Sequence, residues 1–384
     1  MKTIQAAKNL NLLSDYVFSS LGKIVAEVEK KANRKVINFG IGSPDIPPKK
    51  EHIQKLTEFI NLPDAHLYPG YGAITEFSEA LIKWYKKRFN ANIAENELLP
   101  LLGAKDGISH LPLALLNPGD EILVPDPGYP AFTYPSLIIG AKPVYYNLKG
   151  GNNFEIDLDE LTEKISSKTK FIWINFPSNP TGQIATIDVL KKVVAFAKKH
   201  NLLIIYDNAY SEITFDGFVA PSILQIEGAS DIAVEIGSFS KTFSFAGFRI
   251  GWIVGNKSII AALSKVKSHM DSGLSLPLQK LGAYALNNFD DSWHQDMILS
   301  YKKRRDIIAE KLQKFGLTFS LPKGGLYIWA KIPSAYKNSE EFCMQLLKEK
   351  QILFAPGTAF GKNGERYIRV SICANIKNIE SYFI

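Results

Sequence analysis

The chain has 384 residues, of which 46% are hydrophobic and 22% charged, and its formal net charge is +7. This composition excludes a disordered or fibrous protein, and the length is sufficient for two domains with a substantial core. The lysines lie mainly in stretches such as IKWYKKRF, at the spacing of a solvated helix face, and no groove-reading motif accompanies them. We therefore expect no nucleic-acid partner.

The sequence predicts neither a signal peptide nor a membrane span. Residues 1–18, MKTIQAAKNLNLLSDYVF, lack a continuous apolar core, and no apolar run is long enough to cross a bilayer. Cys343 and Cys373 are too few for a disulfide framework and lack the spacing of metal ligands. We predict a cytoplasmic protein without a membrane partner or a metal centre.

The N-terminal region, residues 1–45, predicts a helix followed by an arm. Residues 15–32, DYVFSSLGKIVAEVEKKA, read as an amphipathic helix. Residues 35–48, KVINFGIGSPDIPP, read as a strand that ends in a loop rich in glycine and proline. The apolar face of the helix consists of Val17, Leu21, Ile24, Val25 and Val28.

Residues 46–285 predict a large domain in which helices and strands alternate. Near-continuous apolar strands separated by amphipathic helices are typical of an α/β fold with a mainly parallel sheet that helices cover on both faces. The predicted strands are 98–103, 121–126, 143–148, 171–177, 202–208, 231–239 and 249–255, and the intervening helices include 74–89, 106–116 and 186–200.

Residues 286–384 predict a smaller α+β domain. Long helices at about 256–270 and 292–315 precede short predicted strands at 317–321, 326–332 and 367–373. We expect the N-terminal region to join this domain, so that the two chain ends build it together.

Polar side chains gather at the predicted carboxyl ends of the strands. In an open parallel sheet, ligands bind beyond these ends. Each residue alone is a weak signal, because a polar residue after a strand is more often a turn or a helix cap. The group comprises Asn179, Asp207, Tyr210, Ser238, Ser240, Lys241 and Arg249, together with a helix start at Gly103, Ala104 and Lys105.

Together these groups fit a cofactor that carries an aldehyde, a phosphate, a phenolic oxygen and a pyridine nitrogen. Lys241 supplies an amine for a Schiff base, and Asp207 keeps the ring nitrogen protonated so that the ring accepts electrons. Asn179 and Tyr210 are suited to the phenolic oxygen. The two serine hydroxyls, Arg249 and the N–H groups of the helix start are suited to the phosphate. We therefore predict pyridoxal 5′-phosphate (PLP).

From about residue 39 to residue 373 the chain resembles the class I/II aminotransferases, which are PLP enzymes of fold type I. The motifs that carry the resemblance are FPSNPTG, YDNAY, SFSKTFSFAGFRIGW and YIRVSI. Lys241 follows Asp207 by 34 residues and Arg249 follows Lys241 by 8, as in the family. The branch that this chain is most similar to includes aspartate and LL-diaminopimelate aminotransferases. The resemblance gives the cofactor-binding residues the same roles as the chemistry does.

The resemblance assigns four further residues. Tyr129, in PDPGYPAF, matches the aromatic residue that stacks on the pyridine ring. Gly42, in GIGSPD, matches a loop that closes over the substrate, and Arg369 matches the arginine that binds the substrate α-carboxylate together with Asn179. Tyr68, in HLYPGYG, matches a tyrosine that reaches the phosphate of the neighbouring subunit. This last match implies a homodimer with shared active sites.

The resemblance implies transfer of an amino group between an L-amino acid and a 2-oxo acid by a ping-pong mechanism, with Lys241, Asp207 and Tyr210 in the catalytic group. A carbon–sulfur lyase on the same scaffold stays as an alternative, because it would share these motifs. A non-catalytic PLP-binding regulator is not expected, since residues before 36 leave no room for a DNA-binding domain. Donors of the aspartate, glutamate or LL-diaminopimelate type are expected if the Lys105 side chain contacts a distal carboxylate. If that side chain turns to solvent instead, Lys105 serves only the phosphate.

Overall fold

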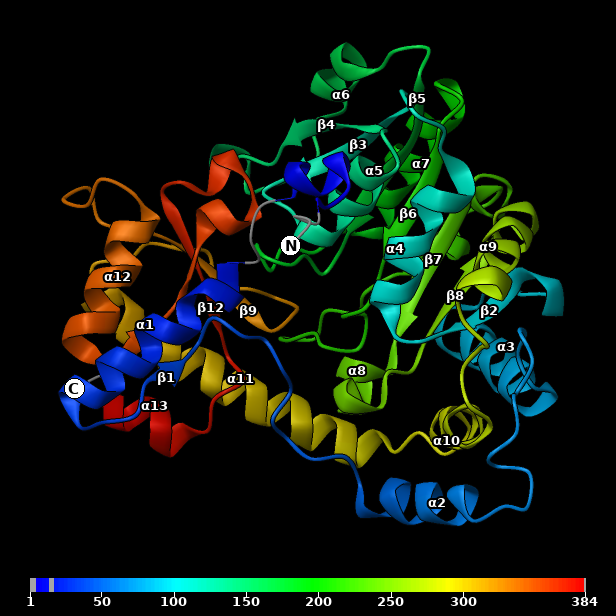
Figure 1. The fold of residues 1–384 in the computed structure, drawn as a ribbon, viewed down its shortest axis with the longest axis horizontal. Helices are drawn as coiled ribbons and strands as arrows, with labels where there is room; N and C mark the ends of the chain where they lie inside the picture. The colour runs from blue at the N-terminus through cyan, green and yellow to red at the C-terminus, as the bar shows by residue number, and fades with distance from the viewer. Residues whose placement is uncertain (1–4, 14–16, 383–384) are drawn as a thin grey trace.

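The structure, a computed structural model, describes residues 5–13 and 17–382 and has a large and a small half (Figure 1). Within these residues the large sheet has the order β2-β8-β7-β6-β5-β3-β4. Strand β8 runs antiparallel to both of its neighbours, and the other ladders are parallel, so the predicted sheet is confirmed with β8 as the exception. The strands are β2 (Leu98–Leu101), β3 (Glu121–Asp126), β4 (Lys142–Asn147), β5 (Thr169–Asn175), β6 (Leu203–Asp207), β7 (Ala233–Ser238) and β8 (Gly251–Gly255).

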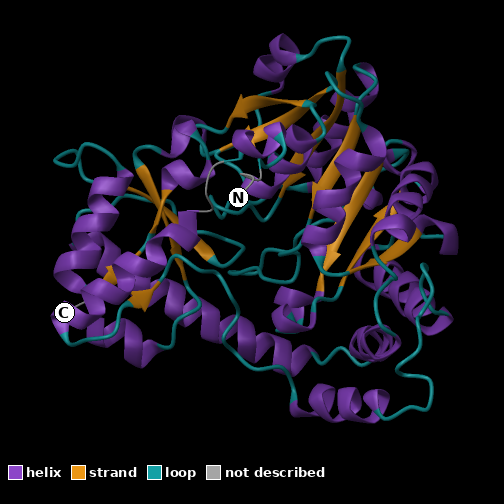
Figure 2. Cartoon of the chain, in the orientation of Figure 1, coloured by secondary structure: helices purple, strands orange, loops and turns teal. Residues whose placement is uncertain are grey.

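Helices cover both faces of this sheet (Figure 2). Ile172 and Ile174 of β5 pack on the face beneath α7, whereas Phe171 and Trp173 pack on the face beneath α4 and α9. Successive side chains of β5 point to opposite faces of the sheet, and both faces are buried. The strand therefore reads as one continuous hydrophobic run. One face carries α4 (Ala104–Leu115), α5 (Tyr134–Ile138) and α9 (Lys257–Met270); the other carries α3 (Thr75–Phe89), α6 (Leu158–Lys164), α7 (Ile187–Lys199) and α10 (Leu276–Asn287).

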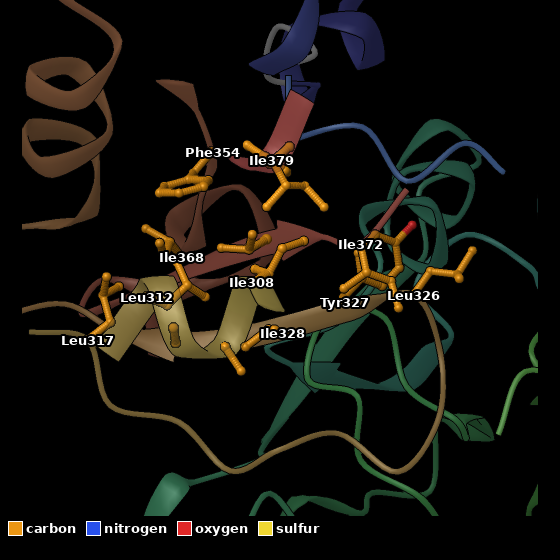
Figure 3. Packing of buried hydrophobic residues seen from close by; sticks show 14 of the residues in the cluster. Ile308, Leu312, Leu317, Leu326, Tyr327, Ile328, Phe354, Ile368, Ile372 and Ile379 are labelled. Carbon is orange, nitrogen blue, oxygen red and sulfur yellow. The ribbon is translucent and has the colours of Figure 1, made fainter. Parts of the chain in front are cut away.

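The small half packs helices on a short antiparallel sheet of order β11-β12-β9. Figure 3 shows Ile308 and Leu312 of α11 against Ile328 of β9 and Ile368 of β12. Its elements are α11 (Asp291–Lys314), β9 (Tyr327–Lys331), α12 (Ser339–Lys350), β10 (Ile352–Leu353), β11 (Ala355–Pro356), β12 (Tyr367–Ser371) and α13 (Ile376–Tyr382).

The N-terminal arm contacts the small half. Strand β1 (Ile37–Asn38) pairs in parallel with β10, and Val28 of α1 (Val17–Ala32) packs against Leu347 and Leu353. The side chains of Val17 and Leu21, which the sequence places on the same apolar face, lie outside the described residues, as do residues 15 and 16.

Three features differ from the sequence-based expectation or were missed by it. The predicted strand at 317–321 is wrong: it forms an isolated bridge at Thr318, because Pro322 and a glycine turn direct the chain away. Helices α2 (Lys50–Ile60) and α8 (Phe239–Thr242) are among the helices that were not predicted, as are α5, α6, α10 and α12, and α2 packs against α10. The predicted boundary at 285 falls inside α10. The domain bounds 1–45, 46–285 and 286–384 stay a prediction. None of the described helices is long and apolar enough to cross a bilayer.

Candidate active site

A pocket of about 460 Å³ opens where the two halves meet, at the carboxyl ends of the parallel strands. The described structure brings nearly all of the predicted site residues to its wall, although they come from distant parts of the sequence. These residues are Gly42, Ala104, Lys105, Tyr129, Asn179, Asp207, Tyr210, Ser238, Ser240, Lys241, Arg249 and Arg369.

The side chain of Asn175, at the end of β5, ties two neighbouring strand ends together. Its amide nitrogen donates to the backbone oxygen of Asp207, at the end of β6, over 2.8 Å. Its amide oxygen accepts the N–H of Asn179 over 2.8 Å. Sequence reasoning missed Asn175, because a buried asparagine at the end of an apolar strand carries no motif of its own. The two bonds fix the places of Asn179 and Asp207 on the pocket wall.

Lys241 lies in the short helix α8, which begins directly after β7. The hydroxyl of Ser238 accepts the N–H of Ser240 over 3.1 Å and so caps this helix. The amine of Lys241 donates to the backbone oxygen of Gly42 over 3.0 Å and lies 5.7 Å from the ring centre of Tyr210. The amine is therefore held inside the pocket and not on a solvated surface.

Asp207 is a buried carboxylate, 5% exposed. Burial raises its pKa to about 7, although the N–H of Ala209 and the charge of Lys241 act in the opposite direction. A carboxylate in such a site favours a cationic partner beside it. A protonated pyridine nitrogen fits that requirement.

The opposite end of the pocket collects groups that bind anions. Gly103 precedes α4 with φ +82°, and a Cβ there would lie 2.2 Å from Nη2 of Arg249, so only glycine allows this close approach. Arg249 donates to the backbone oxygens of Ala246 and Leu102. The buried Ser238 and Ser240 lie on the same pocket. The start of α4, the guanidinium and the hydroxyls fit a phosphate.

A buried ion network fixes the start of α4. Asp106 accepts the N–H of Leu102 over 2.8 Å and an N–H of Lys267 over 2.5 Å, and Lys267 also reaches Asp271 over 2.7 Å. His110 lies 2.6 Å from the other oxygen of Asp106. Asp106, His110 and Asp271 are close enough together to hold a metal ion, and the ammonium of Lys267 pairs with both carboxylates. The network therefore holds the start of α4 at this end of the pocket.

Arg369 comes from β12 of the small half and is buried. Its Nη1 donates to Oδ1 of Asn179 over 2.6 Å, and its Nη2 donates to the backbone oxygen of Gly40 over 2.5 Å. The ring centres of Tyr327 and Phe360 lie 4.1 Å and 4.5 Å from the guanidinium carbon. A buried, well-held guanidinium at a pocket is suited to binding a carboxylate.

Tyr327 of β9 is a pocket residue that the sequence did not reveal. Its hydroxyl lies 3.2 Å from that of Tyr210, and burial together with Tyr327 raises the pKa of Tyr210 well above 10. A Cβ on Gly42 would lie 2.0 Å from the Tyr327 hydroxyl, so Gly42 must lack a side chain. Tyr327 stands in an apolar strand, where a tyrosine reads as an ordinary core residue, and it belongs to no motif.

Lys105, Tyr129 and Tyr68 complete the predicted set. The ammonium of Lys105 lies 5.7 Å from the ring centre of Tyr129, and burial together with Arg249 lowers the pKa of Lys105. Tyr68 is 87% exposed and lies away from the pocket of its own chain.

Comparisons with known proteins identify the family of this chain. Residues 34–381 match the family model of aminotransferase class I and II. The LL-diaminopimelate aminotransferase of Halothermothrix orenii is 38% identical over 378 residues (98% of this chain, 96% of that protein), and that of Aquifex aeolicus is 40% identical over 365 residues (94% and 93%). An aminotransferase structure from Staphylococcus aureus has a TM-score of 0.89 at 34% identity, covering 98% of this chain and 97% of that one.

These similarities confirm the predicted family, the transaminase activity and the cofactor. They do not favour the carbon–sulfur lyase, since the relatives named above are aminotransferases and match this chain over nearly their whole length. The chain belongs to the class I and II aminotransferases and is a PLP-dependent transaminase.

Proposed function

We propose that the amino donor is an L-amino acid with a second charged end, of the LL-diaminopimelate, aspartate or glutamate type, and that 2-oxoglutarate is a good acceptor. The observation that carries this proposal is the place of Lys105 on the pocket wall, near Tyr129. Lys105 and Arg249 bring two positively charged side chains to one pocket. In this proposal Arg249 serves the phosphate and Lys105 serves the second charged group of the substrate. The relatives named as LL-diaminopimelate aminotransferases support the same substrate class.

The pocket residues fit PLP at both ends. Asp207 would hold the proton of the ring nitrogen, and Asn179 and Tyr210 would bind the phenolic oxygen. Tyr129 would stack on the ring, and Arg249, with the two serines and the start of α4, would bind the phosphate. When bound, PLP supplies a protonated ring that accepts the electron pair released at the substrate Cα.

Lys241 and Arg369 act on the substrate itself. Arg369 binds the α-carboxylate and so orients the substrate, and Nζ of Lys241 takes the proton from Cα. Both side chains now donate to one segment, Arg369 to Gly40 and Lys241 to Gly42. Movement of the segment that contains Gly40 and Gly42 would therefore release one N–H donor of Arg369 and one of Lys241 at the same time. The 2-oxo acid formed in the first half-reaction leaves before the second substrate binds to the same residues, which is the basis of ping-pong kinetics.

The active form is, in this proposal, a homodimer in which Tyr68 serves the site of the neighbouring subunit. Apolar side chains around Tyr68 are exposed, among them Leu67, Tyr71 and Met270. The segment 67–71 lies beside residues 270–273, because a Cβ on Gly273 would be 2.1 Å from the oxygen of Gly70. An exposed apolar patch of this kind is typical of an interface. Location in the cytoplasm stays a prediction.

A panel of amino donors tests the substrate class. Lys105→Ala is expected to lower kcat/KM for acidic donors by about ten- to a hundredfold, the effect of losing a charge-assisted contact. Alanine and aromatic donors should keep nearly the wild-type values. Equal losses for acidic and neutral donors would show that Lys105 serves the phosphate turn only. Release of ammonia and pyruvate without an acceptor would instead indicate the lyase.

A further inference from the structure

One of the contacts between the small half and the large sheet is made by a loop, residues 357–364, here called the clasp loop. It contains the short helices η8 (Gly357–Phe360) and η9 (Lys362–Gly364). The buried carboxylate of Asp126, the last residue of β3, accepts the N–H groups of Lys362 and Asn363, each over 3.1 Å. The amide of Asn363 donates to the backbone oxygen of Asp126 and, over 2.8 Å, to Oδ1 of Asn147 at the end of β4.

The clasp loop is shaped to receive this carboxylate. Gly361 has φ +134°, and a Cβ there would lie 2.1 Å from Oδ1 of Asp126. A Cβ on Gly357 would lie 2.2 Å from the oxygen of Gly364, so the loop is also closed tightly on itself. A side chain at either position would therefore displace the loop.

The clasp loop places Phe360 against Arg369. The N–H of Gly128, two residues after Asp126, donates to the backbone oxygen of Phe360 over 2.8 Å. The Phe360 ring lies 4.5 Å from the guanidinium carbon of Arg369 and packs edge-on against Trp329. Trp329 is the cross-strand partner of Arg369 in β9 and β12. The large half therefore holds the aromatic residue that packs against the substrate arginine.

We propose that Asp126 is a positioning residue for the substrate α-carboxylate: by seating the clasp loop it holds Phe360 against Arg369 and fixes the guanidinium at the pocket. This inference rests on the proposed role of Arg369. Asp126 does not line the pocket, so it acts on substrate binding through the loop and leaves the cofactor site unchanged. A loosened loop gives the guanidinium more freedom, which substrate binding must then remove.

Steady-state kinetics of the PLP-loaded enzyme test the proposal. Asp126→Ala should raise the KM of both the amino acid and the 2-oxo acid about tenfold and change kcat less than about threefold. Asp126→Asn should fall between Ala and wild type, because its amide oxygen can accept one of the two N–H groups. Glu121→Gln, at the other end of β3, where the carboxylate accepts from Ser166, is the matched control and should leave KM unchanged.

Two further measurements separate positioning from a general loss of structure. Titration calorimetry of 2-oxoglutarate into the PLP-loaded enzyme, to which it binds without reacting, should show a raised Kd, with unchanged cofactor absorbance and affinity. In a Phe360→Leu background, Asp126→Ala should add less than about twofold, because both act through one contact. Gly361→Ala keeps the carboxylate but displaces the loop, and should reproduce the rise in KM.

An unchanged KM and Kd in the Asp126 variants would overturn the proposal, as would fully additive losses with Phe360→Leu or a loss of cofactor binding. Arg369→Lys distinguishes a failure of this inference from a failure of the proposed carboxylate site. If Arg369→Lys raises KM and the Asp126 variants do not, this inference fails alone. If Arg369→Lys also leaves KM unchanged, the proposed carboxylate site fails with it.

Discussion

The hydroxyl of Tyr327, from the small half, lies 3.2 Å from the hydroxyl of Tyr210, from the large half. Tyr327→Phe removes this contact but keeps the ring beside Arg369. We expect kcat/KM to fall by about two- to tenfold, the usual effect of losing one neutral hydrogen bond. Tyr327→Ala also removes the ring and should raise KM further. Kinetics of the two variants side by side check this, and equal values would show that the ring makes no contribution.

Lys241 is expected to carry the covalent link to the cofactor. Borohydride treatment of the purified protein should fix PLP to the peptide that contains Lys241, as read by mass spectrometry. Lys241→Ala should still bind PLP through its phosphate, but turnover should fall by at least about 10²- to 10⁴-fold. Attachment to a different lysine would refute the assignment.

Asp207 makes the stability of the cofactor-free protein depend on pH. Its folded pKa of about 7 lies above the ordinary value of 3.8, so between these values the folded protein holds a proton that the unfolded chain has released. The contribution of Asp207 to stability should therefore fall as the pH rises from about 4 to 7. The melting temperature of the wild type minus that of Asp207→Asn should accordingly fall across this range, and the substitution should also strongly reduce turnover of the PLP-loaded enzyme. A difference between the two proteins that does not change with pH would refute the assignment to Asp207.

His52 should give a pH dependence of the opposite sign. It is buried against the rings of Phe243, Phe245, Tyr284 and Trp293, and burial, helped by Lys49 and opposed by Glu51 and Asp290, lowers its pKa to about 4. Its stabilising contribution is complete above the ordinary pKa of 6.5 and is lost as the pH falls toward 4. The melting temperature of the wild type minus that of His52→Leu should therefore rise as the pH rises from about 4 to 6.5.

The control for this measurement is His66→Gln, a substitution of an exposed histidine. It should leave the curve of melting temperature against pH as in the wild type. An acid-side slope of wild-type size in His52→Leu would mean that His52 is not its source.

The proposed sharing of active sites is tested by mixing subunits. Tyr68→Ala and Lys241→Ala chains should each be poorly active alone. A heterodimer of the two has one site in which neither defect is present, so mixing after partial denaturation should restore activity. The measurement is specific activity against mixing ratio. A flat, additive response would mean that each chain builds its site alone.

The parallel sheet and most of the cofactor site could be predicted because their signals are local. Buried strands such as β5 read as unbroken apolar runs, and Asp207 and Ser238 stand directly at strand ends. A parallel sheet then brings those ends to one edge, so their order along the chain was enough to place them together.

Other parts of the site could not be predicted, because they depend on contacts between distant segments. Tyr327 reads as an ordinary core residue until β9 is paired with β12. Asp126 stands in the motif PDPGYPAF, in which the family resemblance assigns a role only to Tyr129. The hydrogen-bond partners of Asp126 lie more than 230 residues further along the chain. Strand β10, with two residues, is too short to show any periodicity.

The antiparallel pairing of β8 with β7 has a consequence for how the chain folds. Ser238 and Gly251 are direct partners in this pair, so Lys241 and Arg249 both lie in the loop that one hairpin closes. Arg369 reaches the same pocket from more than a hundred residues further along the chain. Closing a short loop loses less chain entropy than closing a long one, and local contacts form faster. We expect Lys241 and Arg249 to be brought together early in folding and Arg369 to join them late.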